Sequence, residues 1–336
     1  MTRPRFSILM PTYNHGRWID VALRSIFDQE TDSLEVTVMD SVSTDETPTL
    51  LAGYGDRIRW IRRKDKGQAD AINQGFALAG GEIVAWLNSD DTYLPGAFAR
   101  VDAAFAADPT LDFVYGDALE IDQEGRILTP NLFTEECSRD RFYFSHDYIC
   151  QPTLFLRRGV LERVGPLRAD LRWFLDYQWL TRFFAAGLRG RRLPHFLAAN
   201  RDHPQTKTNS GGLRRWWEIM SVLASTPPPG PLVVARRCVW IYSLEYVIKT
   251  INAAPWGATE DSSRDAREWR AAVLARLNRW FMQLVSPRSF NDIVHRYHRD
   301  IAPAGGTVAG LWSRHAAKRL AAAPPSVSGS SSAAAP

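Results

Sequence analysis

The feature that most restricts the fold of this chain is a regular alternation of short apolar runs and amphipathic stretches before residue 125. Short apolar runs are typical of buried strands, whereas apolar residues that repeat at intervals of three and four are typical of helices. The predicted strands are 6–10, 35–40, 57–62, 82–87 and 113–122, and the predicted helices are 18–27, 44–51, 67–79 and 95–107. Strand–helix alternation with short loops predicts an α/β fold of the Rossmann type, in which helices flank a mostly parallel sheet on both faces.

The pattern changes in the rest of the chain. We expect a polar loop over 200–212 and helices over 174–186, 214–224, 232–252, 264–285 and 288–299. The proline-rich run 227–231 is typical of a rigid linker, and the Ala/Pro/Ser-rich carboxyl end is typical of disorder. The sequence therefore predicts a sheet domain over 1–212, a helical extension over 213–320 and a disordered tail over 321–336.

Composition limits the classes of protein to consider. The 336 residues are 45% hydrophobic and 23% charged, which is ordinary for a globular protein, and the net charge of +4 is too small to predict nucleic-acid binding. The sequence has no apolar stretch long enough to span a membrane and no apolar run typical of a signal peptide. Cys137, Cys150 and Cys238 lack the spacing of a metal site and are expected to be reduced thiols. We therefore expect a cytoplasmic location.

Positive charge and tryptophan are concentrated in the helical extension. From residue 213 onward there are 16 Lys and Arg residues against 8 Asp and Glu, and seven of the 12 Trp residues. The segments 214–217 and 236–242 mix cations with aromatic rings. Two interpretations stay open. Either these helices lie on the inner face of a membrane, with Trp and Arg at headgroup depth, or their aromatic side chains pack on the sheet domain.

Polar clusters follow three of the predicted strands at the point where each strand ends, at 12–14, 40–41 and 88–91. In open α/β sheets, ligands bind beyond the carboxyl ends of the strands, so we expect these clusters to meet in one crevice. Asp40 can accept a hydrogen bond from a nucleobase N–H. The adjacent Asp90 and Asp91 form either a site for a hard divalent cation or a pair that caps the following helix.

The helix predicted over 67–79 carries polar side chains near its start. Gln68 and Asp70 fall in its first turn, and Asn73 lies on the same face as Asp70, three residues further on. Taken singly, each of them is either a cap or turn residue or part of a ligand site.

Four motifs in this order resemble those of the family 2 glycosyltransferases, which have the GT-A fold. They are Pro11-Thr12-Tyr13-Asn14, the turn 40–45, the helix 67–75 and the acidic region 88–91. The resemblance covers about residues 5 to 210. Two positions depart from the family pattern: the turn 40–45 lacks the second Asp and the Gly, and Asn88 stands where many members have Asp.

The resemblance implies a GT-A-like domain that binds a UDP- or GDP-linked sugar together with Mg²⁺ or Mn²⁺. It implies that Asp40 contacts the nucleobase, that Asp90 contacts the ribose or the metal, and that Asp91 binds the metal. The remaining donor contacts that it implies from these motifs are Pro11, Thr12, Tyr13, Asn14, Gln68, Asp70 and Asn73.

Asp176 lies among aromatic residues at the start of the helix predicted over 174–186. From the sequence alone it is either an ordinary acid at a helix N-terminus or a carboxyl whose pKa is raised by burial. The family places a general base at this position, so the resemblance implies that Asp176 takes a proton from the acceptor hydroxyl.

Two further segments resemble the family. Gln151 would line the sugar or acceptor site, or form a turn before a strand. In the loop after residue 200, His203 would complete the metal site, or belong to a surface turn. Arg201 and Lys207 would neutralise the diphosphate.

Together these residues predict inverting transfer of a sugar from a nucleoside diphosphate to the hydroxyl of a glycan or a lipid-linked acceptor. The resemblance places this reaction in cell-surface polysaccharide or lipopolysaccharide biosynthesis. A nucleotidyltransferase is one alternative, but it would need a Gly-rich basic loop after the first strand, and this sequence does not supply one. The other is a non-catalytic nucleotide-sugar-binding or membrane-scaffold relative, in which Ser41 and Asn88 are signs of decay; the presence of Asp90, Asp91 and Asp176 argues against it.

Overall fold

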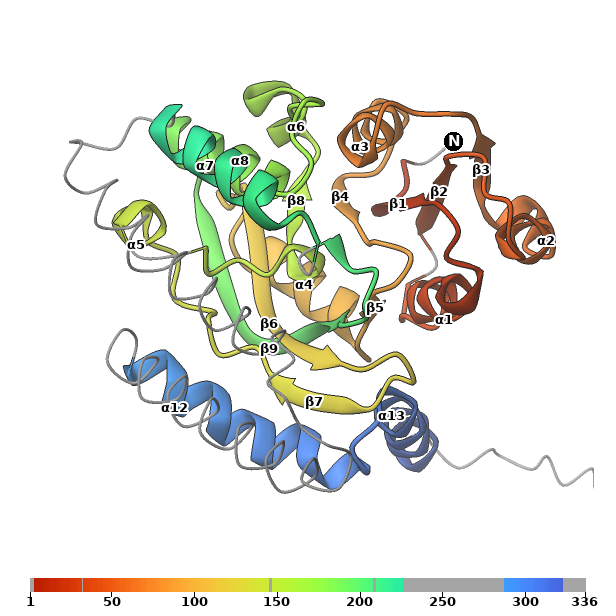
Figure 1. The fold of residues 1–336 in the computed structure, drawn as a ribbon. Helices are drawn as coiled ribbons and strands as arrows, with labels where there is room; N and C mark the ends of the chain where they lie inside the picture. The colour runs from red at the N-terminus through yellow and green to blue at the C-terminus, as the bar shows by residue number, and fades with distance from the viewer. Residues whose placement is uncertain (1–2, 32, 145–146, 208–209, 226–286, 323–336) are drawn as a thin grey trace, which may run out of the picture.

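The computed structural model describes residues 3–31, 33–144, 147–207, 210–225 and 287–322. Within these residues, nine strands form one sheet in the order β3-β2-β1-β4-β8-β6-β9-β5, and β7 pairs with β6 (Figure 1). Helices cover both faces of this sheet. The α/β fold class predicted from the sequence is confirmed.

The first half of the sheet is parallel, as the alternation predicts. β1 pairs in parallel with β2 and with β4, and β2 pairs in parallel with β3. The elements are β1 (Phe6–Thr12), α1 (Gly16–Phe27), β2 (Leu34–Asp40), α2 (Thr47–Ala52), β3 (Arg59–Arg62), α3 (Gln68–Phe76), β4 (Ile83–Trp86) and α4 (Ala97–Ala107). Because these strands run in one direction, the loops after β1, β2 and β4 open at the same edge of the sheet.

The second half of the sheet is mixed, which the sequence did not indicate. It contains β5 (Thr92–Tyr93), β6 (Phe113–Ile121), β7 (Ile127–Pro130), β8 (Phe155–Arg157) and β9 (Gly190–Arg201). The short β8 runs antiparallel between β4 and β6, whereas β6 and β9 are parallel. Strand β9 also includes Asn200 and Arg201, which the sequence analysis placed in a loop.

Alternate residues of each central strand enter two different cores. Ile8 of β1 packs in the core that contains α1 and α4. Leu9 and Trp86 pack in the opposite core, with α3, α6 (Gly159–Val164) and α7 (Leu175–Ala185). At Gly75 a β-carbon would collide with the side chain of Leu9, so this glycine allows α3 to lie close to β1.

Helix α8 (Gly212–Ser225) confirms the helix predicted over 214–224. It buries Ile219, Val222 and Leu223, whereas the side chains of Leu213 and Trp217 are 64% and 65% exposed. α5 (Arg139–Phe144) is a short helix whose Phe142 packs, like the buried residues of α8, in the core that contains Leu9 and Trp86.

The last described helices, α12 (Pro287–Arg296) and α13 (Val308–Ala322), lie beside β7 and the lower end of β6 in Figure 1. α12 continues into a wider helical turn, Tyr297–Ile301, and Ile293 of α12 shares a core with residues of β6 and β9. The helices expected over 232–252 and 264–285, and residues 323–336 of the expected tail, lie outside the described residues.

A buried ion cluster fastens α12 to the sheet. Asp117 of β6 accepts from Arg192 Nη2 of β9 at 2.7 Å through Oδ1, and lies 2.8 Å from Arg296 Nη2 of α12 through Oδ2. All three side chains are almost fully buried. In the part of the chain that the structure describes, no helix is both long and apolar enough to cross a membrane.

Candidate active site

A cleft of about 940 Å³ lies at the edge of the sheet where β1, β2 and β4 end. Its volume is in the range of small-molecule sites in proteins. The side chains predicted from the sequence that line it are Pro11, Thr12, Tyr13, Gln68, Asp90, Asp91, Gln151, Asp176, Arg201 and Lys207. The strand-end clusters therefore converge in the described structure as the topology of the sheet predicts.

Asp90 and Asp91 lie in the turn after β4, in different surroundings. Asp91 is buried; its Oδ1 accepts from Arg201 N at 3.0 Å and its Oδ2 accepts from Asn88 Nδ2 at 3.1 Å. Asp90 Oδ2 lies 3.1 Å from His203 Nε2. One carboxylate is thus fixed by amides and the other by an imidazole.

Because their surroundings differ, the pKa values of the two carboxyl groups shift in opposite directions. Burial raises the pKa of Asp91 well above its usual range, and the neighbouring charge of Asp90 adds to this effect. Burial also acts on Asp90, but the hydrogen bond with His203 and the charge of His15 outweigh it, so the pKa of Asp90 is lowered.

This donor set fits a hard divalent cation, because a cation would offset the repulsion between two adjacent, largely buried carboxylates. Among the residues that the structure describes, no three His, Cys, Asp or Glu side chains are gathered as a metal site. Further ligands would therefore come from the phosphates of the donor and from water, which is how Mg²⁺ is commonly bound.

His203 contacts Asp90 but does not line the cleft. Its ring is buried against Trp18, with ring centroids 4.3 Å apart, and lies 6.2 Å from the ring of His15. His15 does line the cleft, and its Nδ1 lies 2.8 Å from Ser89 Oγ. The sequence analysis missed His15, although it directly follows the Pro-Thr-Tyr-Asn turn.

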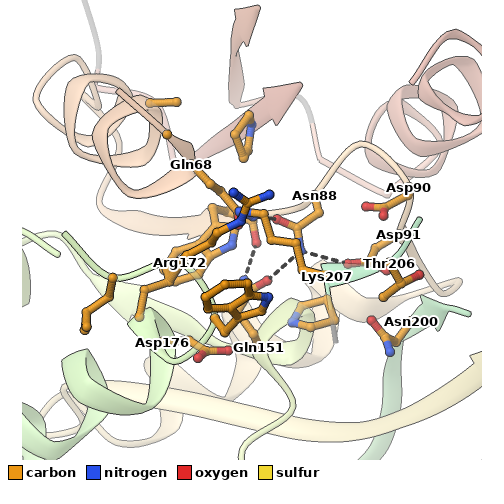
Figure 2. Close-up of a pocket in the computed structure, with 18 of the residues that line it drawn as sticks. Gln68, Asn88, Asp90, Asp91, Gln151, Arg172, Asp176, Asn200, Thr206 and Lys207 are labelled. Carbon is orange, nitrogen blue, oxygen red and sulfur yellow. Dashed lines mark hydrogen bonds between the residues drawn. The ribbon is translucent and has the colours of Figure 1, made fainter. Parts of the chain in front are cut away.

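A chain of side-chain hydrogen bonds crosses the cleft (Figure 2). Lys207 Nζ donates to Gln68 Oε1 at 2.6 Å, and Gln68 Nε2 donates to Asn88 Oδ1 at 2.7 Å. Asn88 Nδ2 in turn donates to Asp91 Oδ2 and, at 3.2 Å, to Gln151 Oε1. Asn88, which departs from the family pattern, is therefore the residue that joins both sides of the network.

Lys207 and Arg201 have different environments, although both were expected to neutralise a diphosphate. Burial, together with the charge of Arg172, lowers the pKa of Lys207 to about 8. The Arg201 guanidinium donates to three backbone carbonyls, those of Asp90 at 2.8 Å, Asp122 at 2.8 Å and Gln123 at 3.0 Å. The structure thus shows Arg201 bracing the turn after β4 from the wall of the cleft, and its contact with a diphosphate stays a prediction.

Asp176 is the second residue of α7 and lines the cleft. Its Oδ1 accepts from Tyr177 N at 2.8 Å. Burial raises the pKa of Asp176, and the positive charges of Arg215 and Lys207 offset part of that effect. A carboxyl with a raised pKa is better suited to accept a proton from a hydroxyl than an ordinary surface aspartate.

Asn14 and Asp40, which were expected to contact the donor, do not line the cleft. Asn14 Oδ1 accepts from Thr44 N at 2.7 Å and so ties the first strand-end turn to the second. Asp40 is buried; its Oδ1 accepts from Ser43 N at 2.8 Å and its Oδ2 lies 3.5 Å from Arg62 Nε.

Asp70 and Asn73 also do not line the cleft, and both side chains form hydrogen bonds with backbone groups. Asp70 Oδ2 accepts from Lys66 N at 3.0 Å, which favours its interpretation as a cap of α3. Asn73 accepts from Leu167 N at 2.8 Å and donates to Leu167 O at 2.9 Å. Both residues thus have structural roles, and donor contact by either of them stays a prediction.

The cleft has a further wall that the sequence did not indicate. Asn131, Phe133 and Asn200 line it. The amides of Asn131 and Asn200 each donate at 3.0 Å to the carboxylate of Glu120, a residue of β6. These residues come from strands and loops that are brought together only by the mixed half of the sheet.

Comparison with known proteins identifies the family of the chain. The chain matches the family model described as glycosyl transferase family 2 over residues 7–165. A PGL/p-HBAD biosynthesis glycosyltransferase of Mycobacterium tuberculosis strain H37Ra is 31% identical over 205 residues, which are 60% of this chain and 77% of the relative. The fold and the family match together define a glycosyltransferase. The chain belongs to glycosyl transferase family 2.

Solved structures share the fold. Staphylococcus aureus TarS 1–349 in complex with UDP aligns with a TM-score of 0.56 and 16% identity, over 94% of this chain and 92% of that chain. The mannosyltransferase PcManGT from Pyrobaculum calidifontis, in complex with GDP-Man and Mn²⁺, aligns with a TM-score of 0.55 and 21% identity, over 90% and 89%. At these identities the likeness shows the GT-A fold alone.

Proposed function

We propose that this glycosyltransferase inverts the anomeric centre of the sugar it transfers, with Asp176 as the general base. The observation that supports this most strongly is a carboxyl of raised pKa in the same cleft as Asp90 and Asp91 but on a different element. In Figure 2, Asp176 and the Asp90–Asp91 pair lie at opposite ends of the labelled group, with Gln151 and Asn88 between them.

In this mechanism, Asp176 takes the proton of the acceptor hydroxyl while the hydroxyl oxygen attacks the anomeric carbon. The bond between that carbon and the diphosphate oxygen breaks, and the nucleoside diphosphate leaves with the electron pair. Attack from the side opposite the leaving group inverts the configuration. One base suffices, because a diphosphate leaves without being protonated.

We assign the donor diphosphate to the side of the cleft formed by β1, β4 and the loop after β9. Asp91 and Asp90, with His203 in contact with Asp90, would hold Mg²⁺ or Mn²⁺, which would neutralise charge on the diphosphate. Lys207 would add a positive charge from the protein itself. The PcManGT complex, which contains GDP-Man and Mn²⁺, is consistent with a UDP- or GDP-linked donor and a divalent cation.

We further propose a glycan or lipid-linked acceptor, used in cell-surface polysaccharide or lipopolysaccharide biosynthesis at the cytoplasmic face of a membrane. The mycobacterial relative is named for PGL/p-HBAD biosynthesis. Helix α8 supplies the structural support: Leu213 and Trp217 are exposed beside Arg214, a combination that suits a membrane interface.

The experiment is a turnover assay with UDP-N-acetylglucosamine, UDP-glucose and GDP-mannose in Mg²⁺ or Mn²⁺, in which water takes the sugar in place of the acceptor hydroxyl and release of nucleoside diphosphate is the signal. Asp176→Asn should lower turnover by about 10²- to 10⁴-fold and leave nucleotide affinity unchanged. The matched control is Asp56→Asn, at an exposed position outside the cleft. Turnover retained in Asp176→Asn would exclude Asp176 as the base.

A further inference from the structure

One wall of the cleft is an irregular segment directly before α7. Its cleft-lining residues are Ala169, Asp170, Leu171, Arg172 and Trp173. The segment leads within three residues from Trp173 to Asp176. Its conformation therefore sets where the proposed base lies.

The carboxylate of Glu218, on α8, holds the end of this segment. Glu218 Oε2 accepts from Arg172 N at 2.9 Å. Glu218 Oε1 accepts from Trp173 N at 2.7 Å and from Phe174 N at 2.8 Å. Three consecutive backbone amides thus donate to one side chain that is more than 40 residues away in the sequence.

Of these three amides, only that of the N-cap residue Phe174 belongs to the start of α7, and the amides of Arg172 and Trp173 lie in the segment before it. The first amides of a helix have no acceptor within the helix, and they carry partial positive charge. Phe174, the N-cap residue of α7, makes no side-chain capping hydrogen bond. The hydrogen bonds that Glu218 accepts therefore satisfy the N-cap amide and fix the backbone that leads into α7, and they are stronger than neutral ones because the carboxylate is charged.

The other end of the wall is fixed as well. Asn73 of α3 binds both the N–H and the carbonyl of Leu167. The wall is therefore held at two points, by α3 on one side and by α8 on the other. α8 also brings the positive charge of Arg215 near Asp176.

We infer that Glu218 is a positioning residue for sugar transfer, which holds the start of α7 so that the Asp176 carboxylate faces the acceptor hydroxyl. This inference rests on the proposed role of Asp176 as the base. Glu218 does not line the cleft, so it acts through the backbone and not on the substrate. Misplacing a reacting group by about 1 Å can lower the rate by about 10²-fold.

The test compares Glu218→Ala and Glu218→Gln in the full chain, using whichever of the three donors named above gives turnover. Glu218→Ala should lower kcat by about 10²-fold and leave the donor KM within about twofold, because the proposed donor contacts lie on other elements. Glu218→Gln keeps one oxygen where Trp173 and Phe174 donate, so it should restore part of the loss. Glu162→Gln, an exposed acid on α6, is the matched control and should behave as wild type.

Hydrogen exchange separates the structural effect from the catalytic one. The amides of residues 172–174 should exchange faster in Glu218→Ala. A wild-type kcat in that variant, or a loss that appears in donor KM alone, would overturn the inference. If Glu218→Ala does not fold, the kcat of Glu218→Gln decides between the same outcomes. Absence of turnover by the wild-type chain would overturn the proposed function and the inference with it, whereas wild-type turnover with unaffected variants overturns the inference alone.

Discussion

Replacing Lys207 with methionine removes one positive charge from the cleft and keeps a side chain of similar length. In the structure, Lys207 Nζ donates to Gln68 Oε1 at 2.6 Å, so the ammonium group lies inside the cleft beside the network that reaches Asp91. A hydrogen bond to a charged group contributes about 1.5–3 kcal/mol. If Lys207 binds the diphosphate, Lys207→Met should therefore weaken nucleotide binding by about 10- to 100-fold.

The pH dependence of binding gives this prediction a second, independent form. Burial lowers the pKa of Lys207 to about 8. A lysine is charged below its pKa, so nucleotide affinity should be steady below pH 8. It should fall as the pH rises above 8, by up to about tenfold per unit. Lys207→Met carries no titrating group at this position and should lack the fall.

Calorimetric titration of UDP and GDP in the presence of Mg²⁺, between pH 6.5 and pH 9, measures both effects. Lys318→Met is the matched control, because Lys318 is exposed on α13 and does not line the cleft. Lys207 does not bind the diphosphate if Lys207→Met binds both nucleotides as tightly as wild type and shows the same pH profile.

Two further predictions concern parts of the molecule outside the cleft. Asp117→Asn should lower the free energy of unfolding by about 3–5 kcal/mol, because it removes the negative charge between two buried guanidinium groups. Urea denaturation measures this, and a loss below about 1 kcal/mol would show that the cluster does not fasten α12 to the sheet. Trp217→Ser should reduce co-flotation with liposomes that contain anionic lipid, because the exposed Trp217 ring on α8 is the side chain expected to enter the membrane interface. Unchanged flotation would count against membrane contact through this helix, and Glu162→Gln serves as the control in both experiments.

The first half of the fold was predictable because its signal is local. Apolar runs mark the strands that end at Thr12, Asp40 and Trp86, and the parallel topology then brings their polar ends together. For the same reason Asp90 and Asp91, which follow β4, lie in the cleft, and Gln68 lines it as the family resemblance implied. These predictions needed no knowledge of which side chains touch.

The roles of single side chains depended on partners far away in the chain, which local patterns do not contain. Asn73 looked like a ligand residue on a helix face, but its partner is Leu167, 94 residues later. Arg201 was expected to neutralise a diphosphate, and the sequence did not show that its guanidinium donates to the carbonyl of Asp90 and to two others. Glu218 gave no signal at all, because nothing in the sequence around α8 shows which amides its carboxylate accepts from.

The short strand β8 illustrates the same limit at the level of the fold. It consists of Phe155–Arg157 and enters the sheet antiparallel between β4 and β6. Three residues are too few to show a period, so the mixed half of the sheet was not visible in the sequence. The wall formed by Asn131, Phe133 and Asn200 depends on that half and was missed with it.

We propose above all that the turn with Asp90 and Asp91 binds a nucleoside diphosphate together with a divalent cation. The most direct test is calorimetric titration of UDP and GDP into the full chain in Mn²⁺ or Mg²⁺, repeated after chelation with EDTA. We expect at least one nucleotide to bind, and its binding to be lost or greatly weakened when the cation is removed and when Asp91 is replaced by Asn. Nucleotide affinity that is the same with and without EDTA would contradict this proposal.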